Sequence, residues 1–141
     1  MPNFVGLRVF LDSNVLFSAS LDEGSRFQNF WRIPGVVPVV SQYVVGEVTR
    51  NVRFAGHDTR LASLLLRTQI VSDADVRLIP PNVALIAKDQ PILAAAIAAS
   101  VDYLITGDKS HFGRLYGTRV SGVYIISPAD FLDQYEDRFP D

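Results

Sequence analysis

Four acidic residues occupy positions from which their carboxylates can meet at one site: Asp12, Glu47, Asp89 and Asp108. Asp12 and Asp108 each follow a short apolar run that is typical of a buried strand. Asp89 precedes a Gln-Pro pair, which indicates the start of a helix. If that helix packs back along the strand that follows it, Asp89 and Asp108 approach each other at the carboxyl edge of a parallel sheet. Glu47 is the least favourably placed, because it lies about 9 Å along a helix from the expected start at Ser41.

Carboxylates crowded together repel one another, and their pKa values rise unless a cation compensates the charge. Such a cluster predicts a metal site, and its all-oxygen ligands favour Mg²⁺ or Mn²⁺. Hydrolysis of phosphodiester bonds suits this arrangement, because a metal ion offsets the repulsion between acid and phosphate, activates water and stabilises the leaving oxygen. Each acid alone has an equally good explanation as a turn former, a helix cap or a solvated side chain. Only their convergence favours a catalytic site.

Apolar runs and helical patterns alternate along the chain. Strands are expected at residues 8–11, 38–40, 76–79, 103–106 and 123–126. Helical segments are expected at residues 15–21, 25–31, 42–50, 59–68, after Asp89, around 110–115 and after Ser127, with Ser41, Asp58 and Ser127 as caps. The alternation predicts an α/β fold, a three-layer α/β/α domain built on a parallel sheet.

The predicted strand at residues 103–106 separates two acids that are close in sequence. Asp102 precedes this strand and Asp108 follows it, and four strand residues span about 13 Å. Asp102 is therefore expected at the opposite edge of the sheet from Asp108. For Asp12 and Asp108 to share an edge, the strands that contain Leu11 and Ile105 must be adjacent and parallel.

Length and composition limit the classes of protein to consider. The 141 residues fit one domain, spanning 1–141, and the absence of cysteine excludes disulfides and thiolate metal sites. No segment has the pattern of a secretion signal or a membrane span, so a cytoplasmic protein without a membrane partner is expected. The formal net charge of −2 gives no global attraction to nucleic acid, which would need a local basic patch or a bound metal.

The ordered set of motifs resembles the PIN domain family. Residues 9–16 read VFLDSNVL, Glu47 lies in a helix after the second strand, and residues 89–96, 102–108 and 126–132 read DQPILAAA, DYLITGD and ISPADFL. The resemblance covers nearly the whole chain. It is greatest to the branch that forms the toxin component of prokaryotic toxin–antitoxin systems, similar to VapC ribonucleases.

This resemblance implies five parallel strands in the order 3-2-1-4-5 and an endoribonuclease that depends on Mg²⁺ or Mn²⁺. Asp12, Glu47, Asp89 and Asp108 match the acidic positions of the family, and Asn14 and Thr106 match flanking polar positions. An RNA substrate, an antitoxin protein and a homodimer are the implied partners. The branch often has further acids just before Asp89, whereas Ile86, Ala87 and Lys88 stand here, which implies a weaker second metal site.

Basic residues flank the acids and are candidates for RNA contact. Lys109, His111 and Arg114 follow Asp108, and Arg50 and Arg53 follow Glu47, although any one of them alone is better explained as a solvated surface cation. Neither histidine has a second histidine at ligand spacing, which argues against histidine-bound zinc.

Three other classes of protein remain as alternatives. A receiver-like phosphoacceptor domain also gathers acids around Mg²⁺, but here Lys109 directly follows Asp108 and no paired acids follow an early strand. A phosphatase of the haloacid dehalogenase type needs a second Asp two residues after Asp12, where Asn14 stands. The third alternative is an inactive PIN-like module that binds RNA or protein, and the presence of all four acids argues against it.

Overall fold

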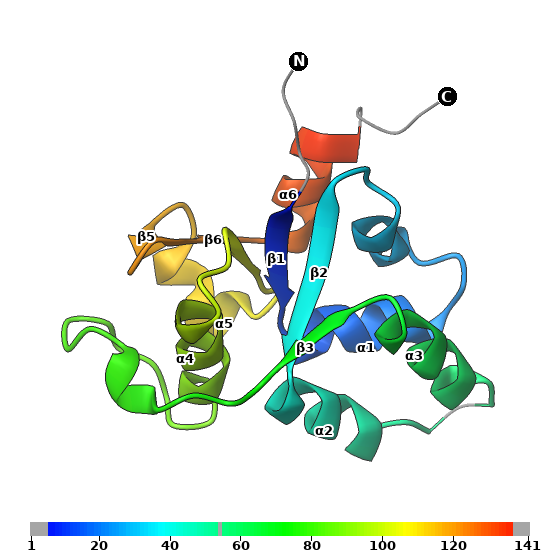
Figure 1. The fold of residues 1–141 in the computed structure, drawn as a ribbon, viewed down its shortest axis with the longest axis horizontal. Helices are drawn as coiled ribbons and strands as arrows, with labels where there is room; N and C mark the ends of the chain where they lie inside the picture. Colours follow the sequence, from blue (N-terminus) through cyan, green and yellow to red (C-terminus); the bar gives the residue numbers. More distant parts are fainter. Residues whose placement is uncertain (1–5, 54, 137–141) are drawn as a thin grey trace.

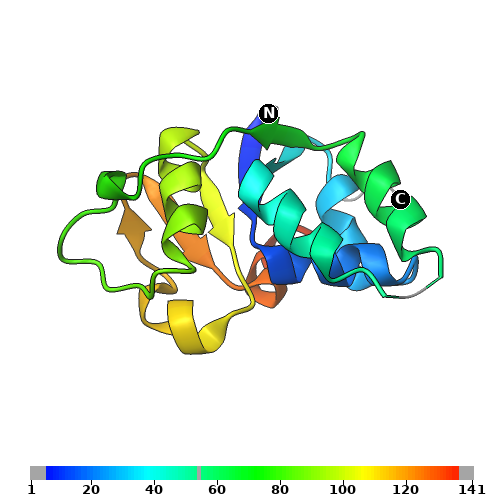
Figure 2. The same ribbon diagram turned by 90° about the horizontal axis from the view of Figure 1, so that it is seen from below.

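A computed structural model describes residues 6–53 and 55–136, which form a mostly parallel sheet with helices on both faces (Figures 1 and 2). The sheet has six strands in the order β3-β2-β1-β4-β6-β5. Their bounds are β1 Leu7–Leu11, β2 Val36–Ser41, β3 Gln69–Val71, β4 Tyr103–Ile105, β5 Arg119–Val120 and β6 Val123–Ile126. The fold is the predicted three-layer α/β/α arrangement.

The predicted adjacency of the first and fourth expected strands is confirmed. β1 and β4 are parallel neighbours, and Leu11 is in register with Ile105. The strand predicted at 123–126 is β6, which pairs in parallel with β4. The sheet differs from the expected five parallel strands by one addition, the short strand β5, which pairs antiparallel with β6 at the edge.

The prediction of a strand at residues 76–79 is wrong. Residues Val76–Leu78 form a short 3₁₀ helix, η2, because the Asp75 side chain accepts a hydrogen bond from the Arg77 backbone and stabilises a turn. The third parallel strand is instead β3, which pairs with the end of β2 through residues Val39 to Ser41.

Six α-helices and two further 3₁₀ helices connect the strands within the described residues. Their bounds are α1 Ser13–Leu21, η1 Arg26–Trp31, α2 Gln42–Arg50, α3 His57–Leu65, α4 Gln90–Ala98, α5 Lys109–Phe112, η3 Gly113–Leu115 and α6 Pro128–Tyr135. Ser41 and Ser127 cap α2 and α6 as predicted, since their side chains accept from Val44 and Asp130 backbone N–H groups. No helix among these residues combines the length and hydrophobicity needed to cross a membrane.

The start of α3 differs from its prediction. Gly56, with φ 79°, is the N-cap, and Asp58 lies in the first turn. The helix ends at Leu65 rather than near Thr68. His57 is fully buried at the start of α3, where its Nε2 lies 2.7 Å from Ser20 Oγ of α1.

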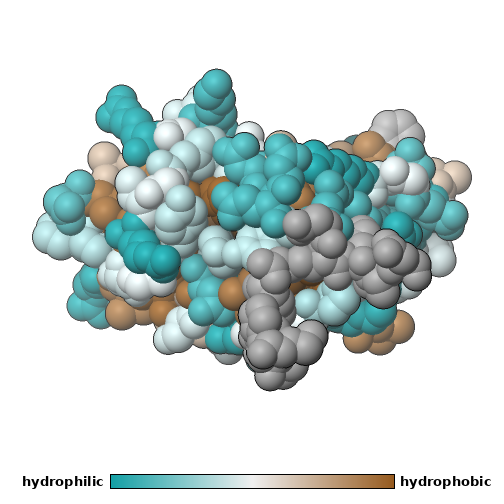
Figure 3. All heavy atoms as spheres, turned by 90° about the horizontal axis from the view of Figure 1, so that it is seen from above, coloured by the Kyte–Doolittle hydropathy of each residue, from teal (hydrophilic) through white to brown (hydrophobic). Residues whose placement is uncertain are grey.

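Close packing of α4 holds the start of this helix in place. Ala94, Ala95 and Ala96 are fully buried, so small side chains bring α4 near β4 and α2. The same strand, β4, also contacts α6, where Phe131 packs edge-on against Tyr103 with ring centroids 5.2 Å apart. At the end of the molecule where β1 begins, hydrophilic residues cover much of the visible surface and hydrophobic ones are scattered among them (Figure 3).

Candidate active site

A cleft of about 550 Å³ opens at the carboxyl ends of β1 and β4, the edge of the sheet that Figure 2 faces. All four predicted acids line it: Asp12, Glu47, Asp89 and Asp108. They come from four separate parts of the chain. The parallel sheet and the start of α4 bring them together, as expected of sites in open α/β folds.

Asp12 is the most enclosed acid of the cleft, with 5% of its surface exposed. Its Oδ2 accepts hydrogen bonds from Thr106 Oγ1 at 2.7 Å and Asn14 Nδ2 at 3.3 Å, and Oδ1 accepts from the Ser13 backbone N–H at 2.6 Å. Burial nevertheless raises the pKa of Asp12 to about 6. The Thr106 and Ser13 hydrogen bonds oppose this rise, and the neighbouring acids Asp89 and Glu47 add to it.

Glu47 reaches the cleft in spite of its position within α2. Its Oε1 accepts a hydrogen bond from Ser13 Oγ at 2.5 Å. Because Ser13 directly follows Asp12, this contact ties the α2 side chain to the end of β1. The helix position that made Glu47 the least favourable of the four acids is therefore compensated by its longer side chain and by a hydroxyl donor on the facing element.

Thr106 and Asn14 connect the ends of β1 and β4. Thr106 Oγ1 donates to Asp12 and accepts from the Asp108 backbone N–H at 3.1 Å. Asn14 Oδ1 accepts from the Gly107 backbone N–H at 3.0 Å, and a Cβ at Gly107 would lie 3.1 Å from that oxygen. A glycine at this turn therefore allows Asn14 to approach the backbone closely.

Asp108 is the N-cap of the short helix α5. Its Oδ1 accepts from the His111 backbone N–H at 3.2 Å and from Ser110 Oγ at 3.1 Å. These contacts fix the carboxylate plane and leave Oδ2 for other partners. Oδ1 of Asp108 thus caps helix α5, while Oδ2 remains available to the cleft.

Asp89 precedes α4 but its side chain makes no capping hydrogen bond. The residue is 6% exposed, and burial raises the pKa of its carboxyl group. His111 opposes that rise, whereas Asp108 adds to it. A buried carboxylate that does not cap its helix is costly unless another group compensates it, so the helix-cap explanation does not account for this side chain.

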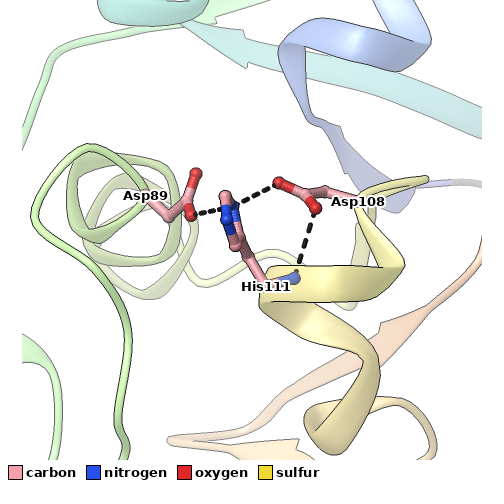
Figure 4. Close-up of side chains that lie close together, drawn as sticks. All are labelled: Asp89, Asp108 and His111. Atoms are coloured by element: carbon pink, nitrogen blue, oxygen red, sulfur yellow. Dashed lines mark hydrogen bonds and ion pairs between the residues drawn. The ribbon is translucent and has the colours of Figure 1, made fainter.

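His111 lies between two of the acids (Figure 4). Its Nδ1 is 2.8 Å from Asp89 Oδ2 and 2.7 Å from Asp108 Oδ2. The sequence suggested His111 only as a candidate for RNA contact, and this double contact was not predicted. The spacing of three residues between Asp108 and His111, which places both on one side of a helical turn, was the available signal.

The basic residues predicted to contact RNA lie outside the lining of the acidic cleft. Lys109 and Arg50 are exposed, and Arg114 lines a neighbouring cleft together with His111. Arg53 lines a smaller adjoining cleft that shares Glu47 with the acidic one. Lys88, which was not predicted as a contact, lines the acidic cleft itself.

Asp102 lies at the opposite edge of the sheet from Asp108, as predicted. Its Oδ2 accepts a hydrogen bond from the Arg8 backbone N–H at 2.8 Å, and its own N–H donates to the Arg8 carbonyl. Asp102 therefore joins the amino ends of β1 and β4, away from the acidic cleft.

The donor set of the cleft fits a divalent cation. Burial and neighbouring acids raise the pKa values of Asp12 and Asp89, and a positive charge would stabilise these two groups as carboxylates. Asp89 Oδ2 is buried and accepts no hydrogen bond from the described residues, and its close polar neighbour there is His111 Nδ1 at 2.8 Å, so this oxygen can serve as an ion ligand. Carboxylate oxygens are the ligands preferred by Mg²⁺ and Mn²⁺.

Comparisons with known proteins identify the family of this chain. The fold is similar to a chain in the crystal structure of VapBC2 from Rickettsia felis bound to a DNA fragment from their promoter, with a TM-score of 0.61 and 16% identity over 85% of this chain and 98% of that chain. A comparison with curated protein sequences gives no significant match. The family model described as PIN domain matches residues 8–110, which include all four acids. The chain belongs to the PIN domain family.

Proposed function

We propose that this protein is a metal-dependent endoribonuclease that hydrolyses phosphodiester bonds of RNA. One observation carries the proposal: Asp12, Glu47, Asp89 and Asp108, which are distant in sequence, line a single cleft. Membership of the PIN domain family supports a nuclease rather than the receiver-like or phosphatase alternatives. The pKa values of Asp12 and Asp89, which are raised chiefly by burial, support a functional site that a bound cation would stabilise.

The four acids divide into two roles in this proposal. Asp12, Asp89 and Asp108 hold the Mg²⁺ or Mn²⁺ ion, and Thr106 and Asn14 fix the Asp12 carboxylate through hydrogen bonds. A bound ion would neutralise charge at the phosphate and lower the pKa of the attacking water. Glu47, whose carboxylate accepts a hydrogen bond from Ser13 Oγ, would take up the proton that the attacking water releases.

Basic side chains near the cleft provide the attraction to RNA that the net charge of −2 does not. Lys88 lines the acidic cleft, and Arg53 lines the adjoining one. Because these two clefts adjoin at Glu47, Lys88 and Arg53 are candidates to contact RNA phosphates on either side of the cleaved bond. Arg50, Lys109 and Arg114 belong to the outer part of this surface.

The resemblance to toxin components extends the proposal to a toxin–antitoxin pair, with an antitoxin protein and a homodimer as partners. The similar chain from Rickettsia felis comes from a VapBC2 complex on promoter DNA. Large hydrophobic side chains are exposed on the segment between α3 and α4: Leu66, Ile70, Val76, Leu78 and Ile86. Exposed apolar residues of this kind suit a protein partner, and light scattering of the purified chain tests the homodimer.

The nuclease proposal is tested by comparing Asp108→Asn with Asp102→Asn. The first change removes a charge from the cleft while it preserves the shape of the side chain, and the second makes the same change at the opposite edge of the sheet. In single-turnover cleavage of a structured RNA with Mn²⁺, Asp108→Asn should lower the rate by orders of magnitude. Asp102→Asn should cleave at nearly the wild-type rate at a temperature where both variants are folded.

Two outcomes contradict the proposal. Equal loss in both variants shows that the effect is not specific to the acidic cleft. No cleavage by the wild type above a chelator blank, with RNA still bound, favours the inactive binding module.

A further inference from the structure

Three potential ligand atoms converge at one corner of the acidic cleft: Asp89 Oδ2, Asp108 Oδ2 and His111 Nδ1 (Figure 4). All three lie within 4.8 Å of one another. Two of the three groups are expected from the acidic motif of the chain. The third is an imidazole nitrogen, which differs from a carboxylate oxygen in the cations it prefers.

The contacts of His111 are not explained by ordinary hydrogen bonding. A ring nitrogen carries at most one hydrogen and can satisfy one acceptor, yet two carboxylate oxygens lie 2.8 and 2.7 Å from Nδ1. Within residues 6–53 and 55–136, neither Nδ1 nor Asp89 Oδ2 has a partner with hydrogen-bond geometry, although both atoms are buried. Buried polar atoms left in this state are costly, whereas a cation shared by the three groups would satisfy them together.

Local structure aims these atoms at a common point. Asp108 Oδ1 accepts hydrogen bonds from the His111 backbone N–H and from Ser110 Oγ, so that Oδ2 faces the imidazole. Phe112, which is fully buried, anchors the turn that carries His111. The ring is thus presented by a fixed element rather than by a free loop.

We propose that His111 Nδ1 is a direct ligand of the catalytic ion, beside Asp89 and Asp108. The inference rests on the proposed nuclease function and deepens it by changing the ligand set from all oxygen to mixed oxygen and nitrogen. Mg²⁺ prefers oxygen ligands, and imidazole binds first-row transition ions more readily. The site therefore selects Mn²⁺ over Mg²⁺.

Pulsed electron paramagnetic resonance of the Mn²⁺-loaded full chain tests the assignment without an activity assay. The sequence holds only two histidines, and His57 is fully buried against Ser20. Nitrogen-14 coupling of an imidazole bound to Mn²⁺ is therefore expected in the wild type and must come from His111. The signal should vanish in His111→Ala and remain in Lys109→Ala, an exposed neighbour on the same turn.

Calorimetric titration gives a second measurement. His111→Ala should weaken Mn²⁺ binding by about tenfold or more, the scale seen when groups around a metal are removed, while Mg²⁺ binding changes less. Lys109→Ala should bind both ions as the wild type does. His111→Asn, checked by circular dichroism, replaces the alanine variant if that variant does not fold.

The outcomes separate this inference from the proposed function. Mn²⁺ bound through the acids without nitrogen coupling, or with coupling that survives in the His111 variants, overturns the ligand role of His111 and leaves the nuclease proposal intact. Failure of the wild type to bind either ion at millimolar concentration overturns both.

Discussion

At the scale of single residues, Asp12 shows how burial and hydrogen bonding compete at this site. Three donors stabilise its charged form, yet its pKa rises to about 6 because burial removes the carboxylate from water and other acids lie near it. The folded protein therefore holds a proton on Asp12 at pH values where the unfolded chain has released it. Metal binding must displace this proton, so the affinity for the ion should increase as the pH rises through 6.

This raised pKa predicts the pH dependence of stability in the metal-free protein. Between the unfolded value near 4 and the folded value near 6, the native state binds more protons, so the free energy of unfolding falls as pH rises. The contribution of Asp12 is present below pH 4 and is lost by pH 6, with a size of about 3 kcal/mol. Urea unfolding at a series of pH values with chelator measures it.

The matched control is Asp12→Asn, which cannot titrate. Its stability should depend less on pH between 4 and 6 than that of the wild type. Because Asp89 also has a raised pKa, part of the slope should remain. Identical slopes in the two proteins would contradict the burial argument for Asp12.

Thr106 provides a second prediction at this scale. Thr106→Val keeps the side-chain shape but removes the hydroxyl that donates to Asp12 and accepts from the Asp108 N–H. Two buried or part-buried groups lose a partner, so the free energy of unfolding should fall by about 1–3 kcal/mol. Thr106→Ser, which keeps the hydroxyl, should lose less, and chemical denaturation of the three proteins provides the comparison.

At the scale of elements, the third strand shows where sequence reasoning fails. Residues 76–79 are more apolar than Gln69–Val71, so the hydrophobic pattern selected the wrong segment. β3 is an edge strand of three residues and is identified by pairing with β2, which is a tertiary contact that local pattern does not encode. In contrast, Ser41 and Ser127 act as caps through contacts within four residues, and these were predictable from the sequence.

The packing of α4 yields a prediction about how this element positions Asp89. Ala95 is fully buried and Ala98 is exposed on the same helix. Ala95→Leu should overpack the contact with the sheet and lower the free energy of unfolding by about 1–3 kcal/mol, whereas Ala98→Leu should have little effect. Thermal denaturation tests this, and equal stability of both variants would show that α4 is not closely packed.

At the scale of the whole molecule, the sheet topology determines which acids meet. The parallel pairing of β1 with β4 was predictable from two buried apolar runs, one followed directly by Asp12 and the other closely followed by Asp108. The two carboxylates can reach one site only if these strands are parallel neighbours, as they are. The reach of Glu47 and the contact of His111 with two acids were not predictable in the same way. They depend on Ser13 Oγ and on the geometry of one helical turn, which the spacing of residues alone does not determine.

The same topology predicts how the folded protein responds to metal. The cleft exists only in the native state, so Mn²⁺ should bind the folded chain and raise its melting temperature. The expected stabilisation is RT ln(1 + [Mn²⁺]/Kd), about 2.7 kcal/mol at one hundred times Kd. Asp12→Asn combined with Asp108→Asn should abolish this shift, and Asp102→Asn should retain it.

The metal-free proteins add an internal check on the same measurement. Because the double variant removes two of four crowded carboxylates, the repulsion among the acids falls, and this offsets part of the stability lost with the Asp12 hydrogen bonds. Because the double variant also lacks two of the proposed ligands, it should gain nothing from Mn²⁺ while the wild type gains several degrees. An equal Mn²⁺-induced shift in both proteins would place the ion elsewhere on the molecule and would remove the acidic cleft as its binding site.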